Sequence, residues 1–114
     1  MDTVMIVIKS GPDSAPRVSE GLRLSAAMLG YDQMPAIVFV DDGVECLRKG
    51  AFEDPTMVDY LQASSDLAGV HALSESLEAR DIEIGDLDRN LEVKVLDLDG
   101  LAGMMSECRA VATY

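Results

Sequence analysis

The segment Met34–Gly50, with the sequence MPAIVFVDDGVECLRKG, decides the fold class of this 114-residue chain. Its residues 36–40 (AIVFV) form a short, unbroken apolar run that is rich in β-branched side chains. A run that is apolar on both faces is typical of a central strand in a parallel sheet, with helices covering each side. The segment therefore predicts an open α/β fold, in which ligands usually bind beyond the carboxyl ends of the strands.

The turn after this strand is acidic. Asp41 and Asp42 end the apolar run, and Gly43 permits a tight turn because it has no Cβ atom. Asp42 is expected to be the N-cap of a helix over residues 44–49, because a carboxylate there can accept hydrogen bonds from the free N–H groups of the first turn. Gly50 is the expected residue just after the end of that helix.

The rest of the chain alternates between apolar runs and helical patterns. Strands are expected at residues 4–8, 70–73, 91–95 and 109–114, and helices at about residues 15–30, 55–69, 74–80 and 100–107. The period-2 pattern of residues 91–95 is typical of a strand near the sheet edge. Alternation of strands and helices implies a parallel sheet with right-handed crossovers. We therefore predict one domain over residues 1–114, a flavodoxin-like or Rossmann-like α/β sandwich with about five mostly parallel strands and helices on both faces.

The net charge of the chain argues against two classes of binding partner. It has 9 Lys and Arg residues against 21 Asp and Glu residues, which gives a formal net charge of −12 at pH 7. This charge argues against direct binding of nucleic acid, which needs a positive surface, and against attraction to anionic membranes. The N-terminal sequence MDTVMIVIKS predicts a strand rather than a signal peptide or a membrane span. The expected compartment is the reducing cytoplasm, with Cys46 and Cys108 as free thiols.

Two polar groups follow the first two predicted strands. The loop at residues 10–16 (SGPDSAP) lacks both the GxGxxG and the P-loop patterns. Either a small anion binds near Ser10, Gly11 or Ser14, or the loop only caps a helix. Asp41 and Asp42 either hold a divalent cation or serve as capping residues. Neither group carries a cofactor signature, and we expect no cofactor and no resident metal.

Three further side chains could carry chemistry. His71 is the only histidine, and it is either a general base near the mouth of the sheet or a structural residue. Cys46 lies soon after the acidic turn, where it is either a reactive thiol or a small core residue. Cys108 lies between the last predicted helix and the last strand, and the neighbouring Arg109 would favour its thiolate form if the sulfur is exposed.

Three segments give the chain a resemblance to the DsrE/DsrF-like sulfur-relay family, and to its DsrF/TusC-type subunits most closely. Residues 38–50 (VFVDDGVECLRKG) are similar to the strand-to-helix segment of the family. Residues 76–81 (SLEARD) are similar to its SLxxRG segment, with Asp81 in place of the usual glycine. Residues 101–114 (LAGMMSECRAVATY) are similar to its terminal helix and strand. The resemblance covers essentially the whole chain.

The resemblance implies a flavodoxin-like fold in a homotrimer, or in a hexamer of homologous subunits, that passes persulfide sulfur between proteins. It also implies a possible sulfur-carrier protein as a partner. In the catalytic-type subunits a cysteine lies three residues before the Ser-Leu pair, and this chain has Leu73 at that position. A leucine cannot form a persulfide, which makes the sulfurtransferase activity of the chain uncertain and agrees with the DsrF/TusC-type assignment.

Three functions are therefore open. The leading hypothesis is an accessory, non-catalytic subunit or stand-alone oligomer of the sulfur-relay type. The second is a persulfide carrier that uses Cys46 or Cys108 as its catalytic thiol. The third is a small-molecule binding module at the strand carboxyl ends, whose candidate pocket residues are Ser10, Gly11, Asp41, Asp42, Gly43, His71 and Leu73.

Overall fold

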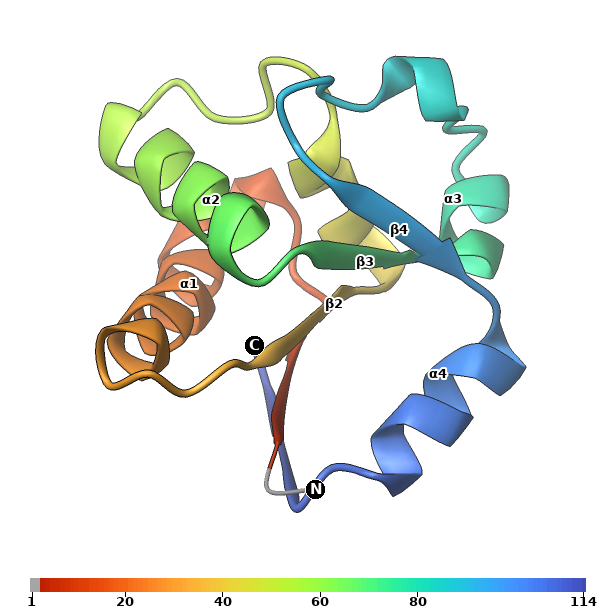
Figure 1. The fold of residues 1–114 in the computed structure, drawn as a ribbon. Coiled ribbons are helices and arrows are strands. Elements are labelled where there is room, and N and C mark those ends of the chain that lie inside the picture. Colours follow the sequence, from red (N-terminus) through yellow and green to blue (C-terminus); the bar gives the residue numbers. More distant parts are fainter. Residues whose placement is uncertain (1–2) are drawn as a thin grey trace.

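The computed structural model describes residues 3–114 as one α/β domain (Figure 1). Its strands are β1 (Val4–Ile8), β2 (Ala36–Phe39), β3 (Val70–Leu73), β4 (Val93–Leu96) and β5 (Ala110–Thr113). Its α-helices are α1 (Ala15–Gly30), α2 (Pro55–Leu67), α3 (Ser74–Ala79) and α4 (Leu98–Ser106). Three 3₁₀ helices are also present: η1 (Pro12–Ser14), η2 (Asp41–Leu47) and η3 (Ile84–Asp86).

The five strands form one sheet in the order β4-β3-β2-β1-β5, and every neighbouring pair is parallel. Strands β1 and β2 are apolar on both faces and lie inside the sheet, as their sequences predict. Strand β4 lies at an edge, as its alternating pattern predicts. The predicted fold class is therefore confirmed.

The two faces of the sheet are covered unequally. Helices α1 and α2 lie side by side over one face, where they enclose the larger core with residues such as Ile6, Phe39 and Leu61 (Figure 1). Helix α4 lies on the opposite face, over a smaller cluster that includes Met5 and Leu101. None of the helices within residues 3–114 is long and apolar enough to span a bilayer.

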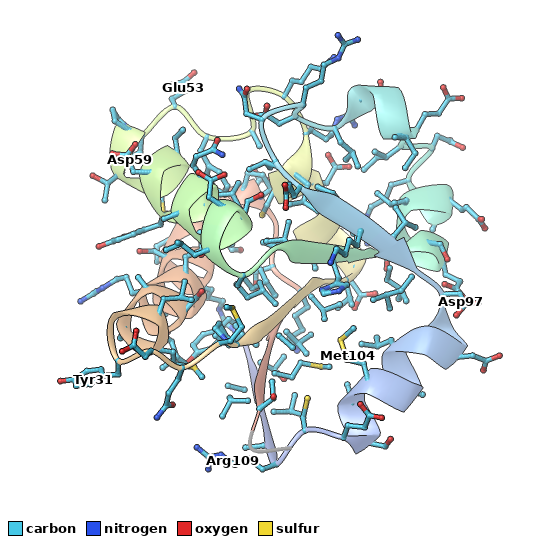
Figure 2. The ribbon with its side chains drawn as sticks, viewed as in Figure 1. Tyr31, Glu53, Asp59, Asp97, Met104 and Arg109 are labelled. Atoms are coloured by element: carbon cyan, nitrogen blue, oxygen red, sulfur yellow. The ribbon has the colours of Figure 1, made fainter. Side chains whose placement is uncertain are left out.

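Two of the α-helices begin with an aspartate that caps the first turn. The Asp54 carboxylate accepts a hydrogen bond from Thr56 N at 2.9 Å at the start of α2. The Asp97 carboxylate accepts one from Gly100 N at 2.8 Å at the start of α4, and Figure 2 shows Asp97 at that end of the helix. Each contact satisfies one of the free N–H groups of the first turn.

The segment after β2 differs from the prediction. Residues 41–47 form the 3₁₀ helix η2 instead of an α-helix over residues 44–49, and Arg48 is already extended. Asp42 is not its N-cap, because that position is occupied by Val40 and no side chain caps the turn. Gly50 does adopt a left-handed conformation, with φ of +69°, but it lies in a turn rather than directly after a helix. Four residues of η2 are buried: Gly43, Val44, Cys46 and Leu47.

Candidate functional site

The carboxyl ends of the parallel strands bring several predicted site residues together. Ser10 and Gly11 follow β1, the acidic turn follows β2, and Leu73 is the last residue of β3. Because neighbouring parallel strands end at the same edge of a sheet, these loops are adjacent. We refer to this group as the carboxyl-end cluster; its members are Ser10, Gly11, Asp41, Asp42, Gly43, Leu73, Ser76 and Arg80.

Backbone contacts close this cluster tightly. A Cβ atom at Gly43 would lie 2.0 Å from the carbonyl oxygen of Ile8, and a Cβ atom at Gly11 would lie 3.1 Å from the carbonyl oxygen of Asp42. Real side chains do not tolerate the first distance. The loops after β1 and β2 are therefore in close backbone contact at these two glycines.

Polar side chains of the third loop complete the carboxyl-end cluster. Ser76 Oγ accepts a hydrogen bond from Asp41 N at 2.9 Å, and Asp41 has a left-handed φ of +50°. Arg80 donates to Asp42 Oδ1 from both Nη2, at 2.8 Å, and Nε, at 3.3 Å. Sequence analysis missed the roles of Ser76 and Arg80, although both lie in the segment that carries the family resemblance. The Asp42 carboxylate is thus used in an ion pair and not as a helix cap.

Asp41 and Asp42 are the acidic side chains of the carboxyl-end cluster. Within residues 3–114 there is no group of three or more His, Cys, Asp or Glu side chains placed to hold a metal ion. Asp41 and Asp42 are both exposed, and the second is engaged by an arginine. The cation hypothesis for these two residues gains no support from this geometry.

Cys46 is a core residue. Its side chain is fully buried among the residues that α1 and α2 cover, and its Sγ donates to the carbonyl oxygen of Ser10 at 3.5 Å. Burial raises the pKa of the Cys46 thiol to about 12, and the neighbouring Glu45 carboxylate acts in the same direction. A thiol of this kind is neither accessible nor ionised near neutral pH, so it is a poor nucleophile.

A cavity of about 350 Å³ lies near the amino ends of the strands, on the face of the sheet that α4 covers. Pro35 and Ala36 line it at the start of β2, and Thr3 lines it just before β1. Met104 of α4 also lines it, and Figure 2 shows this side chain on the side of the helix that faces the sheet. The remaining lining residues are Met34, His71, Glu107 and Cys108. We refer to this space as the amino-end cavity.

The structure places His71 in the amino-end cavity and not in the carboxyl-end cluster. His71 is the second residue of β3, and its Nδ1 lies 3.2 Å from the carbonyl oxygen of Ile37. Because a carbonyl only accepts, Nδ1 carries the proton and Nε2 is left with a lone pair. Burial lowers the pKa of His71, and the nearby Lys94 ammonium lowers it further, although the bond to Ile37 opposes them. The ring is therefore neutral near pH 7.

Cys108 lines the same cavity. Its thiol is half-buried and donates to the carbonyl oxygen of Met104 at 3.4 Å. The sequence places His71 and Cys108 in separate segments, and only the packing of α4 against the sheet makes them line a common space. No motif in the sequence predicts this arrangement, because 36 residues, including all of strand β4, lie between the two side chains in the chain.

Two solved structures share the fold over nearly their whole length. The ychN protein from E. coli aligns with a TM-score of 0.80 and 20% sequence identity over 100% of both chains. A protein of unknown function, MTH1491 from Methanobacterium thermoautotrophicum, aligns with a TM-score of 0.65 and 19% identity over 98% of this chain and 97% of that one. At these identities the likeness concerns the fold alone. A comparison with curated proteins gives no match.

The family model of the DsrE/DsrF-like family matches residues 2–114, which is nearly the entire chain. This match agrees with the segments that carry the resemblance in sequence and with the all-parallel five-stranded sheet. The chain therefore belongs to the DsrE/DsrF-like family.

Proposed function

We propose that this protein is an accessory subunit of a cytoplasmic sulfur relay, of the DsrF/TusC type, which supports persulfide transfer between proteins without carrying the sulfur at its strand ends. Membership of the DsrE/DsrF-like family supports the sulfur-relay role. The observation that carries the accessory role is Leu73. This residue ends β3 at the position where the catalytic-type subunits have cysteine, and it is buried against the α4 side of the sheet.

The thiols of the chain support this proposal. Cys46 is the only cysteine near the carboxyl-end cluster, and burial raises its pKa to about 12. Cys108 lines the amino-end cavity, at the opposite end of the strands from the carboxyl-end cluster. Within residues 3–114 the carboxyl-end cluster thus has no thiol that could accept sulfur from a partner protein.

Assembly and docking are the functions left to such a subunit. Helix α4 exposes Leu98 (58% exposed) and Met105, and the edge strand β5 exposes Val111. Exposed apolar side chains at an edge and on a helix are compatible with contacts between subunits. A homotrimer, or a hexamer with homologous subunits and a sulfur-carrier protein as a further partner, is the assembly we propose.

The proposal is tested by intact mass after exposure to inorganic polysulfide. The test uses a Cys108→Ser background, so that only thiols at or near the carboxyl-end cluster are present. We expect no added sulfur in this background, and one added sulfur atom when Leu73→Cys is introduced. Leu73→Ala in the same background is the matched control for the loss of the leucine side chain. Uptake of sulfur by the Cys108→Ser protein itself would assign the carrier role to Cys46 and overturn the accessory role.

The assembly is tested separately by native mass spectrometry at micromolar concentration. We expect a trimer or a hexamer of the chain, and Met105→Glu should shift it toward the monomer because a charge would be buried in the contact. A wild-type protein that stays monomeric at every concentration would contradict the stand-alone oligomer.

A further inference from the structure

The amino-end cavity has no part in the proposed function, and it is lined by the half-buried thiol of Cys108. We propose that it is a reaction pocket for small, uncharged organic compounds that contain a sulfur–sulfur bond, with Cys108 as the nucleophile. This inference goes beyond the accessory role and does not depend on it.

The size and lining of the cavity are those of a small-molecule site. Its volume of about 350 Å³ falls within the range of roughly 300–1,000 Å³ that is typical of ligand pockets. Met34, Pro35, Ala36 and Met104 form its apolar part. The methionine thioethers are polarisable and adapt to ligands of irregular shape, including other sulfur compounds. Such a lining favours an uncharged organic molecule, because a charged one would lose its hydration without a partner.

The polar groups of the lining select the chemistry. Cys108 supplies a thiol among them, and this thiol is half-buried rather than enclosed. A thiolate reacts reversibly with sulfur–sulfur bonds without any added oxidant or reductant. The Glu107 carboxylate, which also lines the cavity, disfavours anionic compounds.

The exchange balances within the pocket. The Cys108 thiolate attacks one sulfur of R–S–S–R′, a new Cys108–S–S–R bond forms, and the bond to R′–S breaks and leaves R′–S⁻. Cys108 is oxidised to a mixed disulfide while the leaving sulfur is reduced. The proton that Cys108 loses is regained by the leaving group, which departs as R′–SH.

His71 is placed to act on the thiol partner in the reverse direction. Its Nδ1–H is held by the Ile37 carbonyl, so the lone pair of Nε2 is the free acceptor of the ring, and no other hydrogen bond of the ring is present within residues 3–114. A thiol bound in the cavity can donate its S–H proton to Nε2 and then attack the Cys108 mixed disulfide as a thiolate. The proton afterwards returns to Cys108. In this step His71 acts through the bound thiol and needs no contact with Cys108.

The first test compares two thiosulfonates on the purified protein. Methyl methanethiosulfonate is uncharged, whereas its 2-sulfonatoethyl analogue is anionic and has the same leaving group. We expect the ratio of their rates at Cys108 to be at least about tenfold larger than at a control cysteine outside the cavity. The control is Ser106→Cys in a Cys108→Ser background, because Ser106 is exposed and lies equally close to Glu107 in sequence. Equal ratios at the two positions would show only the general effect of the acidic protein and would overturn the proposal.

The second test fills the cavity. Ala36→Leu should slow the reaction of the uncharged reagent at Cys108 about tenfold and leave the reaction at the control cysteine unchanged. Met34→Trp, at a residue that is 58% exposed, fills the rim of the cavity if Ala36→Leu prevents folding. An unchanged rate in a folded filling variant would show that the cavity does not take the reagent.

The third test isolates His71. The mixed disulfide formed with methyl methanethiosulfonate is released either with ethanethiol or with tris(hydroxypropyl)phosphine, which has no thiol proton to give up. His71→Leu should slow release by ethanethiol about tenfold and change release by the phosphine by less than about twofold. An equal effect on both reagents would mean that His71 only supports the fold of the pocket. Because none of these readouts involves the carboxyl-end cluster or oligomerisation, failure here leaves the accessory role intact, and failure of the accessory role leaves this result intact.

Discussion

The carboxyl ends and the amino ends of the strands differ in how closely the chain packs around them. At the carboxyl edge, Gly11 and Gly43 let two loops touch through their backbones, and Ser76 and Arg80 fill the remaining hydrogen-bonding positions. At the amino edge, on the α4 side, a cavity of about 350 Å³ remains open between the sheet and the helix. The loops after β1 and β2 thus pack directly against each other where ligands usually bind in open α/β sheets, whereas the amino ends of the strands line a cavity.

This difference has a physical origin in the coverage of the sheet. Helices α1 and α2 cover one face together, whereas the nine-residue helix α4 is the main cover of the other. A single short helix cannot fill the surface of five strands, so space remains beside it near the starts of the strands. The position of a cavity in this fold therefore depends on how the helices cover the sheet as well as on the direction of the strands.

The largest expected contrast between the two edges is in thiol reactivity. With iodoacetamide at pH 8, Cys46 in the native protein should react at least ~10³-fold more slowly than Cys108, since a thiol with a pKa of about 12 is only about 10⁻⁴ ionised at that pH and is also buried. Peptide mapping by mass spectrometry gives both rates. In denaturant the two rates should come within a few-fold of each other. Rapid labelling of native Cys46 would show that the carboxyl edge opens.

The next largest effect is expected on stability, from the backbone contact between the loops after β1 and β2. Gly43→Ala should lower the free energy of unfolding by about 3 kcal/mol or more, because the new Cβ would meet the Ile8 carbonyl oxygen at 2.0 Å and both atoms belong to backbone. Urea unfolding measures the change. Gly30→Ala is the control, since nothing lies within 4 Å of its Cβ position at the end of α1, and it should be neutral or stabilising by up to about 1 kcal/mol. Similar losses for the two variants would contradict the tight closure.

A smaller effect is expected from the histidine of the amino-end cavity. The pKa of His71 is lowered from its ordinary value of 6.5 in the folded protein, chiefly by burial. Below pH 6.5 the unfolded chain therefore binds a proton at this residue more readily than the folded protein does. The resulting stability is fully present above pH 6.5 and is lost as the pH falls from 6.5 through the lower folded pKa. The difference in unfolding free energy between wild type and His71→Leu should therefore decrease from pH 7.5 to pH 5. NMR of the single imidazole should show a midpoint below 6.5, and a midpoint above it would contradict the buried neutral ring.

The smallest effect is expected from the ion pair between Arg80 and Asp42. The arginine side chain is 25% exposed and the aspartate side chain is 74% exposed, so solvent screens the pair. A double-mutant cycle with Arg80→Gln and Asp42→Asn should give a coupling energy of about 0.2–1 kcal/mol that declines with added salt. The exposed pair of Arg48 and Glu45 is the matched control, and its single contact of 3.5 Å should couple less. A coupling of several kcal/mol would mean that the carboxyl edge depends on this pair.

Much of the fold was predictable from local patterns. The apolar runs of β1 and β2 mark interior strands, and the alternating run around β4 marks an edge strand. Asp54 with Pro55 marks the start of α2 because that pair satisfies one free N–H group and removes another. These signals work because they depend on neighbours within a few residues.

Other features of the site could not be predicted in this way. The helix expected over residues 44–49 is a 3₁₀ helix that begins at Asp41, since the contact of Gly43 with Ile8 constrains the turn. The carboxylate of Asp42 binds Arg80, which is 38 residues away in sequence. Contacts of this range have no local signal.

The α/β class, the parallel sheet, the family and the absence of a cysteine at position 73 all follow from the amino-acid sequence. Hydrophobic periodicity, caps and the identity of one residue suffice for these, because each is a property of a short segment. The burial of Cys46, and the position of His71 and Cys108 on one cavity, follow from the folded chain and not from any local pattern. The burial of Cys46 and the proximity of the cavity residues depend on how α1, α2 and α4 pack on the sheet. That packing brings together residues that are far apart in the chain.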